Sequence, residues 1–267
     1  MNELYLEIAE FRIAIRFKID MKEDTYLFIK KNFEDDMVFS LRNFFIEKPN
    51  KIDFTVDIII PDSIETKVDE SGSMYAKLFS AHKNHYTVPL QISQSQFRMV
   101  LLNVIHKLLA KHNGFVMHSS AAAIGGKAYL FLGESGAGKS TTARLLSRNY
   151  PIVGDDSGII RKKGRKYYFY STPFIEKVPW IRRERDRFPV GGLVFLKKDN
   201  SFRLEKVTNN KSILDKVVNQ LIVTDSVDSF VPHVFEFVSK FDDFYFLHFA
   251  KDENKLVELF KKINEKN

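Results

Sequence analysis

The sequence contains no cysteine. Without thiols the chain can form no disulfide framework, no thiolate metal site and no cysteine nucleophile. It also lacks any apolar run approaching the roughly 18–20 residues that a membrane-spanning helix needs. The first residues, MNELYLEIAEF, include acids and do not have the basic-then-apolar layout of a signal peptide. We therefore expect a cytoplasmic protein without a membrane partner.

Excess charge is confined to one segment. The net charge is +7 over 267 residues, and residues 161–187 contain ten lysines or arginines and three acids, which equals the whole excess. A positive charge this local does not indicate a nucleic-acid partner. With 44% apolar and 28% charged residues, the composition is typical of a globular chain with an ample core.

A glycine-rich segment, GESGAGKS at 133–140, is the strongest signal in the sequence. It follows the apolar run AYLFL and precedes the helical pattern TTARLL, which is the order of strand, loop and helix that a phosphate-binding loop (P-loop, Walker A) requires. The glycines let consecutive backbone N–H groups point at phosphate oxygens, and the helix start adds its positive dipole end. Lys139 can reach the β- and γ-phosphates, and the Ser140 hydroxyl can ligate Mg²⁺. We predict that a nucleoside triphosphate is bound by Gly133, Glu134, Ser135, Gly136, Ala137, Gly138, Lys139, Ser140 and Thr141.

Two adjacent acids, Asp155 and Asp156, end a short apolar segment after the loop. Ligands of α/β sheets collect at the C-terminal ends of strands, so we expect this pair beside Lys139 and Ser140. Carboxylates are the hard oxygen ligands that Mg²⁺ prefers. Only 16 positions separate Lys139 from Asp155. This spacing disfavours the common GTPase and ATPase modules, in which the second acidic motif follows a longer excursion.

Hydrophobic periodicity predicts two domains. Residues 1–92 are predicted to form a small antiparallel β-rich unit, with strands at 4–19, 26–29, 37–41, 52–58, 75–79 and 86–90. Residues 93–267 are predicted to be α/β (mixed α+β), with a helix at 96–112, a hairpin of 115–123 and 127–132, and later helices at 212–221 and 251–265.

Four motifs together resemble those of the HPr kinase/phosphorylase family and, more remotely, of ATP-dependent phosphoenolpyruvate carboxykinase. They are His118 in HSSAAA, the Gly125-Gly126 hairpin, the loop GESGAGKS, and VGDD at 153–156. The resemblance covers residues 113–200 and extends more loosely to the C-terminus.

The resemblance implies a phosphate-loop kinase domain of the HPr kinase and phosphoenolpyruvate carboxykinase type, preceded by the β-rich unit. It implies ATP and Mg²⁺ as cofactors and transfer of the γ-phosphate to a hydroxyl, namely a serine of a peptide or protein. Lys139 and the loop amides would hold the phosphates, and Ser140 with one acid would hold Mg²⁺. The family's catalytic base matches one of Asp155 and Asp156, and either acid can take either role. His118 matches the family's histidine near the γ-phosphate.

The basic segment offers further candidates. Phosphoryl transfer needs positive charge near the transferred group. Arg182, Arg183, Arg185 and Arg187 can supply it or can attract an acidic or phosphorylated substrate. The alternative is a solvated basic loop. Glu176 lies in STPFIE, which is similar to a Pro-Phe segment of HPr-kinase-like proteins, and is a candidate for binding metal or substrate.

Two departures lead us to expect a divergent relative of the family. The glycine-rich signature that follows the acid pair in HPr kinase/phosphorylases is absent, and residues 1–92 have no match. Two other functions stay open, a kinase for a small hydroxylated metabolite and a nucleotide-binding regulator without catalysis. Carboxykinase activity is disfavoured because the chain is much shorter than those enzymes. The sequence is compatible with a homo-oligomer.

Overall fold

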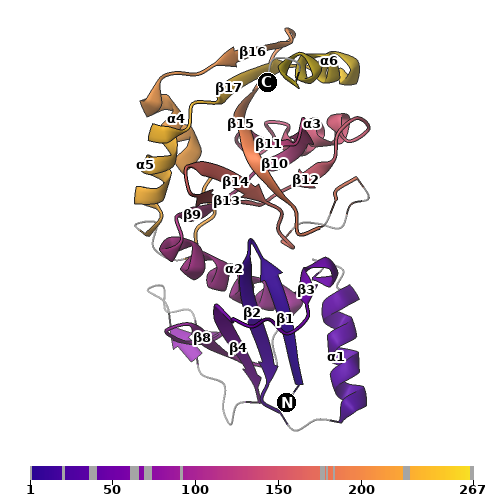
Figure 1. Ribbon diagram of the computed structural model, residues 1–267, viewed down its shortest axis with the longest axis vertical. Coiled ribbons are helices and arrows are strands. Elements are labelled where there is room, and N and C mark those ends of the chain that lie inside the picture. The colour runs from indigo at the N-terminus through magenta and orange to yellow at the C-terminus, as the bar shows by residue number, and fades with distance from the viewer. Residues whose placement is uncertain are drawn as a thin grey trace. The chain divides into compact units, whose positions relative to one another are not determined.

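The computed structural model divides the chain into two compact units, Met1–Leu108 and Leu109–Asn267. It describes residues 2–19, 22–35, 41–60, 66–68, 74–90, 93–174, 178, 180–182, 184–224 and 229–264. The class is mixed α/β, with one large sheet in each unit and a two-stranded sheet of β5 and β6 in the first unit (Figure 1). The division falls within helix α2 (Gln94–Lys111), whereas the sequence analysis placed it before that helix. No helix in the described part of the chain is long and apolar enough to cross a lipid bilayer.

The first unit contains a six-stranded sheet in the order β3-β1-β2-β4-β8-β7. Strands β1 and β2 pair antiparallel, but β2–β4 and β4–β8 pair parallel, so the prediction of an antiparallel unit is wrong for these pairs. Parallel neighbours need a long crossover, and the chain between β2 and β4 supplies one that contains α1. The elements are β1 (Asn2–Ile8), β2 (Phe11–Phe17), α1 (Glu23–Asp35), η1 (Arg42–Phe44), β3 (Phe45–Ile46), β4 (Phe54–Ile59), β5 (Thr66–Val68), β6 (Met74–Ala76), β7 (Ser80–His82) and β8 (His85–Pro89).

Several predicted elements of this unit differ from the structure. The segment 4–19 is a hairpin, because Ala9 and Glu10 adopt φ angles of 51° and 63° and turn the chain between β1 and β2. Residues 26–29 lie in helix α1, and the strand predicted at 37–41 lies almost wholly outside the described residues. The strands at 52–58 and 86–90 are confirmed as β4 and β8.

The second unit is built on a nine-stranded sheet. Its main path runs β12-β10-β11-β15-β14-β13-β9, with β17 beside β15 and β16 beside β17. The strands are β9 (Gly114–Met117), β10 (Ser120–Ile124), β11 (Lys127–Leu132), β12 (Ile152–Gly154), β13 (Gly158–Lys163), β14 (Lys166–Tyr170), β15 (Arg187–Lys198), β16 (Arg203–Lys206) and β17 (Phe244–Phe249). The helices are α3 (Lys139–Leu146), α4 (Asn210–Val218), α5 (Val231–Lys240) and α6 (Glu253–Asn264).

Four strands of this sheet end at the same edge. Strands β11, β15 and β17 pair parallel. Strand β12 has the same direction, because β11 and β12 are both antiparallel to β10. The C-terminal end of β11 leads into the glycine-rich loop, and that of β12 leads into the acid pair. This is the edge at which α/β sheets bind ligands.

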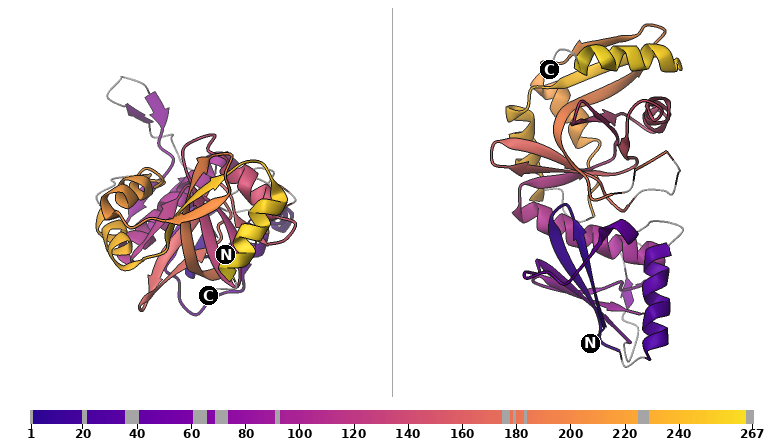
Figure 2. Two further views of the ribbon diagram at one scale, coloured as in Figure 1. Left: turned by 90° about the horizontal axis from the view of Figure 1, so that it is seen from above. Right: turned by 45° about the vertical axis from the view of Figure 1, so that its right-hand side comes forward.

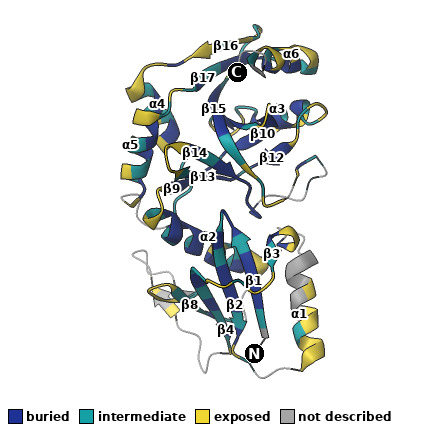
Figure 3. Ribbon diagram, viewed as in Figure 1, coloured by how far each residue is buried: buried dark blue, intermediate teal, exposed yellow. Residues whose placement is uncertain are grey.

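Helices cover both faces of the sheet. Figures 1 and 2 show α3 and α6 on one face and α4 and α5 on the other. On the α3 side, Ala143 and Leu146 of α3 and Leu256 and Phe260 of α6 share a core with Phe131 of β11. Strands β10 and β11 are buried along nearly their whole length (Figure 3), which explains why SAAAI and AYLFL show no polar alternation.

Two predictions near the division between the units had different outcomes. The helix at 96–112 is confirmed as α2, and Ser93 and Gln96 form a reciprocal capping box at its start, with hydrogen bonds of 2.7 Å and 3.2 Å. The strand at 115–123 is wrong as a single element. It breaks at His118 into β9, which pairs with β13, and β10, which pairs with β11 and β12.

Candidate active site

The glycine-rich loop connects β11 to α3, so the predicted order of strand, loop and helix is present. Gly136 and Gly138 have φ angles of 75° and 107°, which residues with a side chain rarely adopt. A Cβ atom at Gly138 would also lie 3.1 Å from Cζ of Phe249. The Thr142 N–H donates to the Gly138 carbonyl at 2.8 Å and begins the helix. The loop therefore depends on glycine both for its backbone angles and for its close approach to an aromatic ring.

Lys139, the first residue of α3, is only 8% exposed. Its Nζ donates to the carbonyl oxygens of Gly133 at 2.8 Å and Glu134 at 3.2 Å. Burial lowers the pKa of Lys139, and the carboxylates of Asp156 and Asp155 oppose that change. The ammonium thus lies at the first two residues of the loop, where low solvation strengthens its attraction for an anion.

Asp155 connects the acid pair to the loop. It is 8% exposed, and its Oδ1 accepts hydrogen bonds from the Ser120 hydroxyl at 2.5 Å and the Ser140 hydroxyl at 3.1 Å. Burial raises the pKa of Asp155; the Ser120 hydrogen bond partly offsets this, and the charge of Asp156 raises the pKa further. A carboxylate that is costly to ionise here is well placed to interact with a cation.

Asp156 and His118 are joined through the backbone. Asp156 has a φ of 65°, and its carbonyl oxygen lies 2.8 Å from His118 Nδ1. A carbonyl can only accept, so Nδ1 of His118 carries the hydrogen in this contact. The His118 N–H donates to the Gln220 carbonyl at 2.7 Å. The break between β9 and β10 thus places the histidine beside the acid pair.

These residues fit a hard divalent cation that is shared with a ligand. The Ser140 hydroxyl and Asp155 Oδ1 are already 3.1 Å apart. Proteins usually hold Mg²⁺ through one or two carboxylates together with substrate phosphates and water. Within the described residues, no three or more His, Asp or Glu side chains are grouped so that they could hold a metal ion by themselves. The donor set therefore suits a metal that arrives with phosphates.

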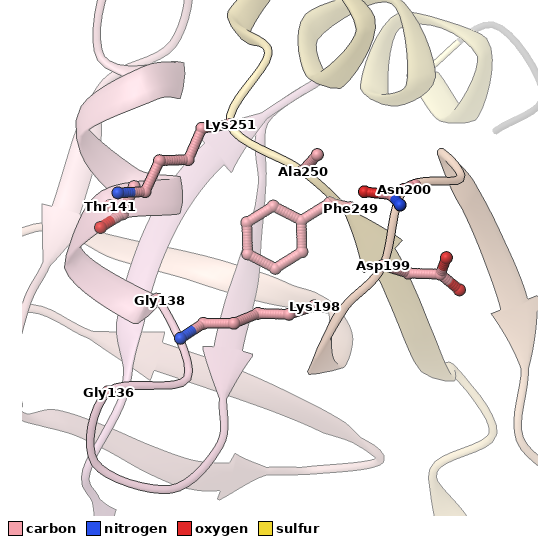
Figure 4. A pocket seen from close by; sticks show the side chains of 9 residues that line it. All are labelled: Gly136, Gly138, Thr141, Lys198, Asp199, Asn200, Phe249, Ala250 and Lys251. Atoms are coloured by element: carbon pink, nitrogen blue, oxygen red, sulfur yellow. The ribbon is translucent and has the colours of Figure 1, made fainter.

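A cavity of about 570 Å³, called here the α3-side cavity, opens beside the loop (Figure 4). Its lining residues come from the loop, from α3 and from the ends of β15 and β17: Gly136, Gly138, Thr141, Lys198, Asp199, Asn200, Phe249, Ala250 and Lys251. In Figure 4 the Lys198 side chain extends towards the loop and the Lys251 side chain towards Thr141. The volume falls within the roughly 300–1,000 Å³ of typical small-molecule sites.

The turn that follows Lys198 is fixed by Asp199. The Asp199 carboxylate accepts from the Ser201 N–H at 3.1 Å and contacts His248 Nδ1 at 2.9 Å. The Ser201 N–H and then His248 lower the pKa of Asp199 to about 2. Because His248 belongs to β17, this contact ties the two strand ends that flank the cavity. Lys198 and Phe249 were not predicted from the sequence; both lie at the ends of parallel strands.

The basic segment 161–187 is partly used within the fold. Lys162 forms an ion pair with Glu236 at 2.6 Å. Arg182 pairs with Glu184 at 2.6 Å and Asp186 at 3.1 Å, and in the described part of the chain no hydrogen bond or ion pair joins it to the loop or the acid pair.

The other predicted residues of this segment have different surroundings. Arg185 is exposed, and the Arg187 guanidinium lies 5.0 Å from the centre of the Tyr168 ring. Glu176 and Arg183 lie outside the described residues.

Ser120 is a site residue that the sequence analysis did not single out. It begins β10, and the pairing of β10 with β12 brings its hydroxyl to Asp155. A hydroxyl at the start of the apolar strand SAAAI, two residues after a candidate histidine, is the signal that could have identified it.

No family model matches this chain, and no curated protein matches it. A solved structure, the Hpr(Ser) kinase/phosphatase from Coxiella burnetii, is similar at 13% identity with a TM-score of 0.33. The match covers 57% of this chain and 97% of that one. A similarity this distant decides neither fold nor activity.

Proposed function

We propose that this chain is an ATP-dependent kinase that uses Mg²⁺ and transfers the γ-phosphate of ATP to a hydroxyl, namely a serine of a peptide or protein. The observation that carries the proposal is the hydrogen bond of 3.1 Å from the Ser140 hydroxyl to Asp155 Oδ1, which joins the phosphate loop to the acid pair. A phosphate loop alone serves binding, whereas transfer also needs a carboxylate to receive the acceptor proton.

The nucleotide would lie across the loop. Loop amides and Lys139 would hold its phosphates, as in other phosphate-binding loops. The α3-side cavity supports this orientation, because it adjoins Thr141 and offers the Phe249 ring as a stacking surface for a base. Lys198 and Lys251 line the same cavity and add positive charge.

The two acids would divide the work. Asp155 contacts Ser140, so these two residues would hold Mg²⁺, which when bound neutralises charge on the β- and γ-phosphates. Asp156 is less buried and would serve as the base. The acceptor oxygen forms a bond to the γ-phosphorus, the bond from that phosphorus to the bridging oxygen breaks, and its electron pair leaves with ADP. The acceptor proton passes to the Asp156 carboxylate.

The choice of a serine acceptor rests on the motif resemblance of residues 113–200. A kinase for a small hydroxylated metabolite would use the same loop, acids and histidine. Only the acceptor side distinguishes the two, so the test has to include both kinds of acceptor.

The test is incubation of the protein with γ-labelled ATP and Mg²⁺ against peptide, protein and metabolite pools. We expect label in peptides or proteins. Asp156→Asn should lower transfer by about 10²–10⁴-fold, as expected for loss of a general base, while ATP still binds. Asp155→Asn should also abolish transfer and should weaken the effect of Mg²⁺ on ATP binding.

Asp215→Asn is the matched control, because Asp215 is an exposed acid on α4, and this variant should keep full transfer. Label found only in metabolites would show that the acceptor is a small hydroxylated metabolite and not a serine of a peptide or protein. Full transfer by both the Asp155 and Asp156 variants would contradict the assignment of these acids.

A further inference from the structure

We propose that a second cavity beside the phosphate loop binds the acceptor and selects one that carries an anionic group, a carboxylate or a phosphate, close to its hydroxyl; this inference rests on the proposed kinase function. The cavity, called here the α4-side cavity, has a volume of about 230 Å³. Its lining includes Gly133, Glu134, Lys197, Lys216, Gln220 and Phe246.

The cavity lies at the end of the loop where the transferable phosphate belongs. Gly133 and Glu134 line it, and their carbonyl oxygens accept the hydrogen bonds from Lys139 Nζ. In a phosphate loop this lysine reaches the β- and γ-phosphates. An acceptor in the α4-side cavity would therefore approach the γ-phosphate from the side away from the nucleoside.

Strand alternation separates the two cavities. Successive residues of a strand point to opposite faces of the sheet. Lys197 accordingly lines the α4-side cavity and Lys198 the α3-side cavity. In β17, Phe246 lines the α4-side cavity. Phe249 is three residues further on, points to the opposite face and lines the α3-side cavity. The two faces of the sheet edge thus carry separate cavities, the α3-side cavity for the nucleotide and the α4-side cavity for the acceptor.

Two lysines of the α4-side cavity share one aromatic ring. Lys197 Nζ lies 3.5 Å and Lys216 Nζ 5.6 Å from the centre of the Phe246 ring. Within the described residues neither lysine has a carboxylate partner. The ring attracts each ammonium, but the two like charges repel each other, so an anion beside them is stabilised by both. Glu134 is the acidic residue among the described lining residues, and it is exposed on the loop.

Gln220 connects this cavity to the histidine of the site. Its carbonyl accepts from the His118 N–H at 2.7 Å. Its side chain is 8% exposed, and Oε1 has no hydrogen-bond donor within the described part of the chain. A buried amide oxygen without a donor favours a ligand that brings one, such as a hydroxyl. The cavity therefore offers cations for an anionic group, and one of its lining residues carries a buried amide oxygen without a donor among the described residues.

The size of the cavity restricts what can enter it. At about 230 Å³ it is smaller than the usual small-molecule site of roughly 300–1,000 Å³. It suits a single acidic side chain near a serine or a small hydroxy acid. Both sources present the same chemistry, an anionic oxygen group next to a hydroxyl, and the experiment has to separate them.

The test compares the full chain with the double variant Lys197→Gln/Lys216→Gln. The probes are a serine peptide pool with flanking Asp and Glu, the same pool with Asn and Gln, and small hydroxy acids such as glycerate. The control is Lys211→Gln/Lys261→Gln, which removes equal charge from exposed lysines on α4 and α6. Initial transfer rates give the acceptor KM, and a titration with ATP gives the nucleotide Kd.

We expect the acidic pool or the hydroxy acids to be used at least tenfold better than the neutral pool, and the one that is used identifies the source. The Lys197/Lys216 variant should raise the acceptor KM at least tenfold with an unchanged ATP Kd, and the control should match the wild type. Equal use of acidic and neutral acceptors overturns the inference. So does a parallel loss of ATP affinity, which would assign the lysines to the nucleotide.

A binding measurement keeps this inference separate from the proposed function. The fluorescently labelled acidic pool and a labelled hydroxy acid are titrated with the protein in the presence of a non-hydrolysable ATP analogue. If the wild type transfers no phosphate but binds one of these probes at least tenfold more tightly than the double variant does, the anion site stands and the kinase proposal fails. If neither probe binds in this assay and neither is phosphorylated, the inference is wrong.

Discussion

Ser120 and Ser119 are adjacent hydroxyls with opposite surroundings. The Ser120 hydroxyl donates to Asp155 Oδ1 at 2.5 Å, whereas the Ser119 hydroxyl is buried and has no hydrogen-bond partner within the described residues. Only the first can hold the Asp155 carboxylate in place. The pair therefore provides a site variant and a matched control one residue apart.

We expect Ser120→Ala to weaken Mg²⁺-dependent ATP binding by about tenfold, since a hydrogen bond to a charged group contributes roughly 1.5–3 kcal/mol. The Ser120 hydrogen bond lowers the pKa of Asp155, so its loss raises that pKa. Because protons compete with the cation for the carboxylate, the pH at which ATP binding is half lost on acidification should move upwards. Titrations between pH 5 and pH 8 measure this, and Ser119→Ala should leave both affinity and pH profile unchanged. An unshifted profile in the Ser120 variant would show that its hydroxyl does not act through Asp155.

Asp155 should cost stability in the absence of a metal. Burial raises the pKa of Asp155 above its value in the unfolded chain. The ionised carboxylate therefore destabilises the fold above the folded pKa, and this cost vanishes once both states are protonated. Asn at this position keeps an oxygen for the two serine hydroxyls without the charge. In metal-free buffer at pH 7, Asp155→Asn should increase the free energy of unfolding by about 1 kcal/mol, which corresponds to a rise in Tm of about 2–4 °C. The difference should shrink towards pH 3, and a lower Tm for the variant at pH 7 would refute this reasoning.

At the scale of elements, the loop between β11 and α3 is the most constrained segment of the site. Gly138 has a φ of 107°, and a Cβ there would lie 3.1 Å from Phe249 Cζ. Gly164, in the turn between β13 and β14, has a φ of 60° and no atom within 4 Å of a built Cβ. The two glycines share the backbone requirement and differ in the contact with the aromatic ring.

Gly138→Ala should lower ATP affinity by at least tenfold, because the loop must shift away from Phe249 and its amides lose their common orientation. Gly164→Ala should cost about 1 kcal/mol of stability from backbone strain alone and should keep the ATP affinity of the wild type. Calorimetric titration and thermal unfolding of both variants separate the two effects. Equal ATP affinity in the two variants would mean that the loop tolerates the shift and is not matched to phosphate.

Local patterns predicted some elements and not others. Helix α2 was predicted because Phe97, Val100, Leu101 and Val104 repeat at helical spacing. Helix α5 was not predicted. It has Pro232 in its first turn, where proline is tolerated because the N–H that it lacks would be unpaired at a helix start. The segment 26–29 is too short for the spacing of its apolar residues to distinguish a strand from a helix. The chain forms helix α1 there.

At the scale of the whole molecule, the motifs predicted which residues lie near one another better than the arrangement of the sheets. Lys139, Ser140 and Asp155 were singled out from short-range patterns and His118 from the motif resemblance, and the structure places them near one another. The parallel pairing of β2 with β4, the break at His118 and the contact of Ser120 with Asp155 depend on which strands become neighbours. A single sequence does not encode strand neighbours locally, because each pairing joins segments distant along the chain.

The two cavities show the same limit. Lys197 and Lys198 are consecutive lysines in the sequence, yet they line different cavities because β15 alternates its side chains between two faces. Their separate surroundings follow from the neighbouring strand β17 and from helices α3 and α4. Only the assembled sheet edge distinguishes them.

The central claim is that the loop at 133–140 binds a nucleoside triphosphate through Lys139. The most direct measurement is a calorimetric titration of ATP with Mg²⁺ into the wild type, Lys139→Ala, and Lys127→Ala at the opposite end of β11. We expect saturable binding by the wild type and the Lys127 variant, and an affinity at least tenfold lower for the Lys139 variant, which is a loss of about 1.4 kcal/mol. No saturable binding by the wild type, or equal affinity in the Lys139 variant, would contradict the claim.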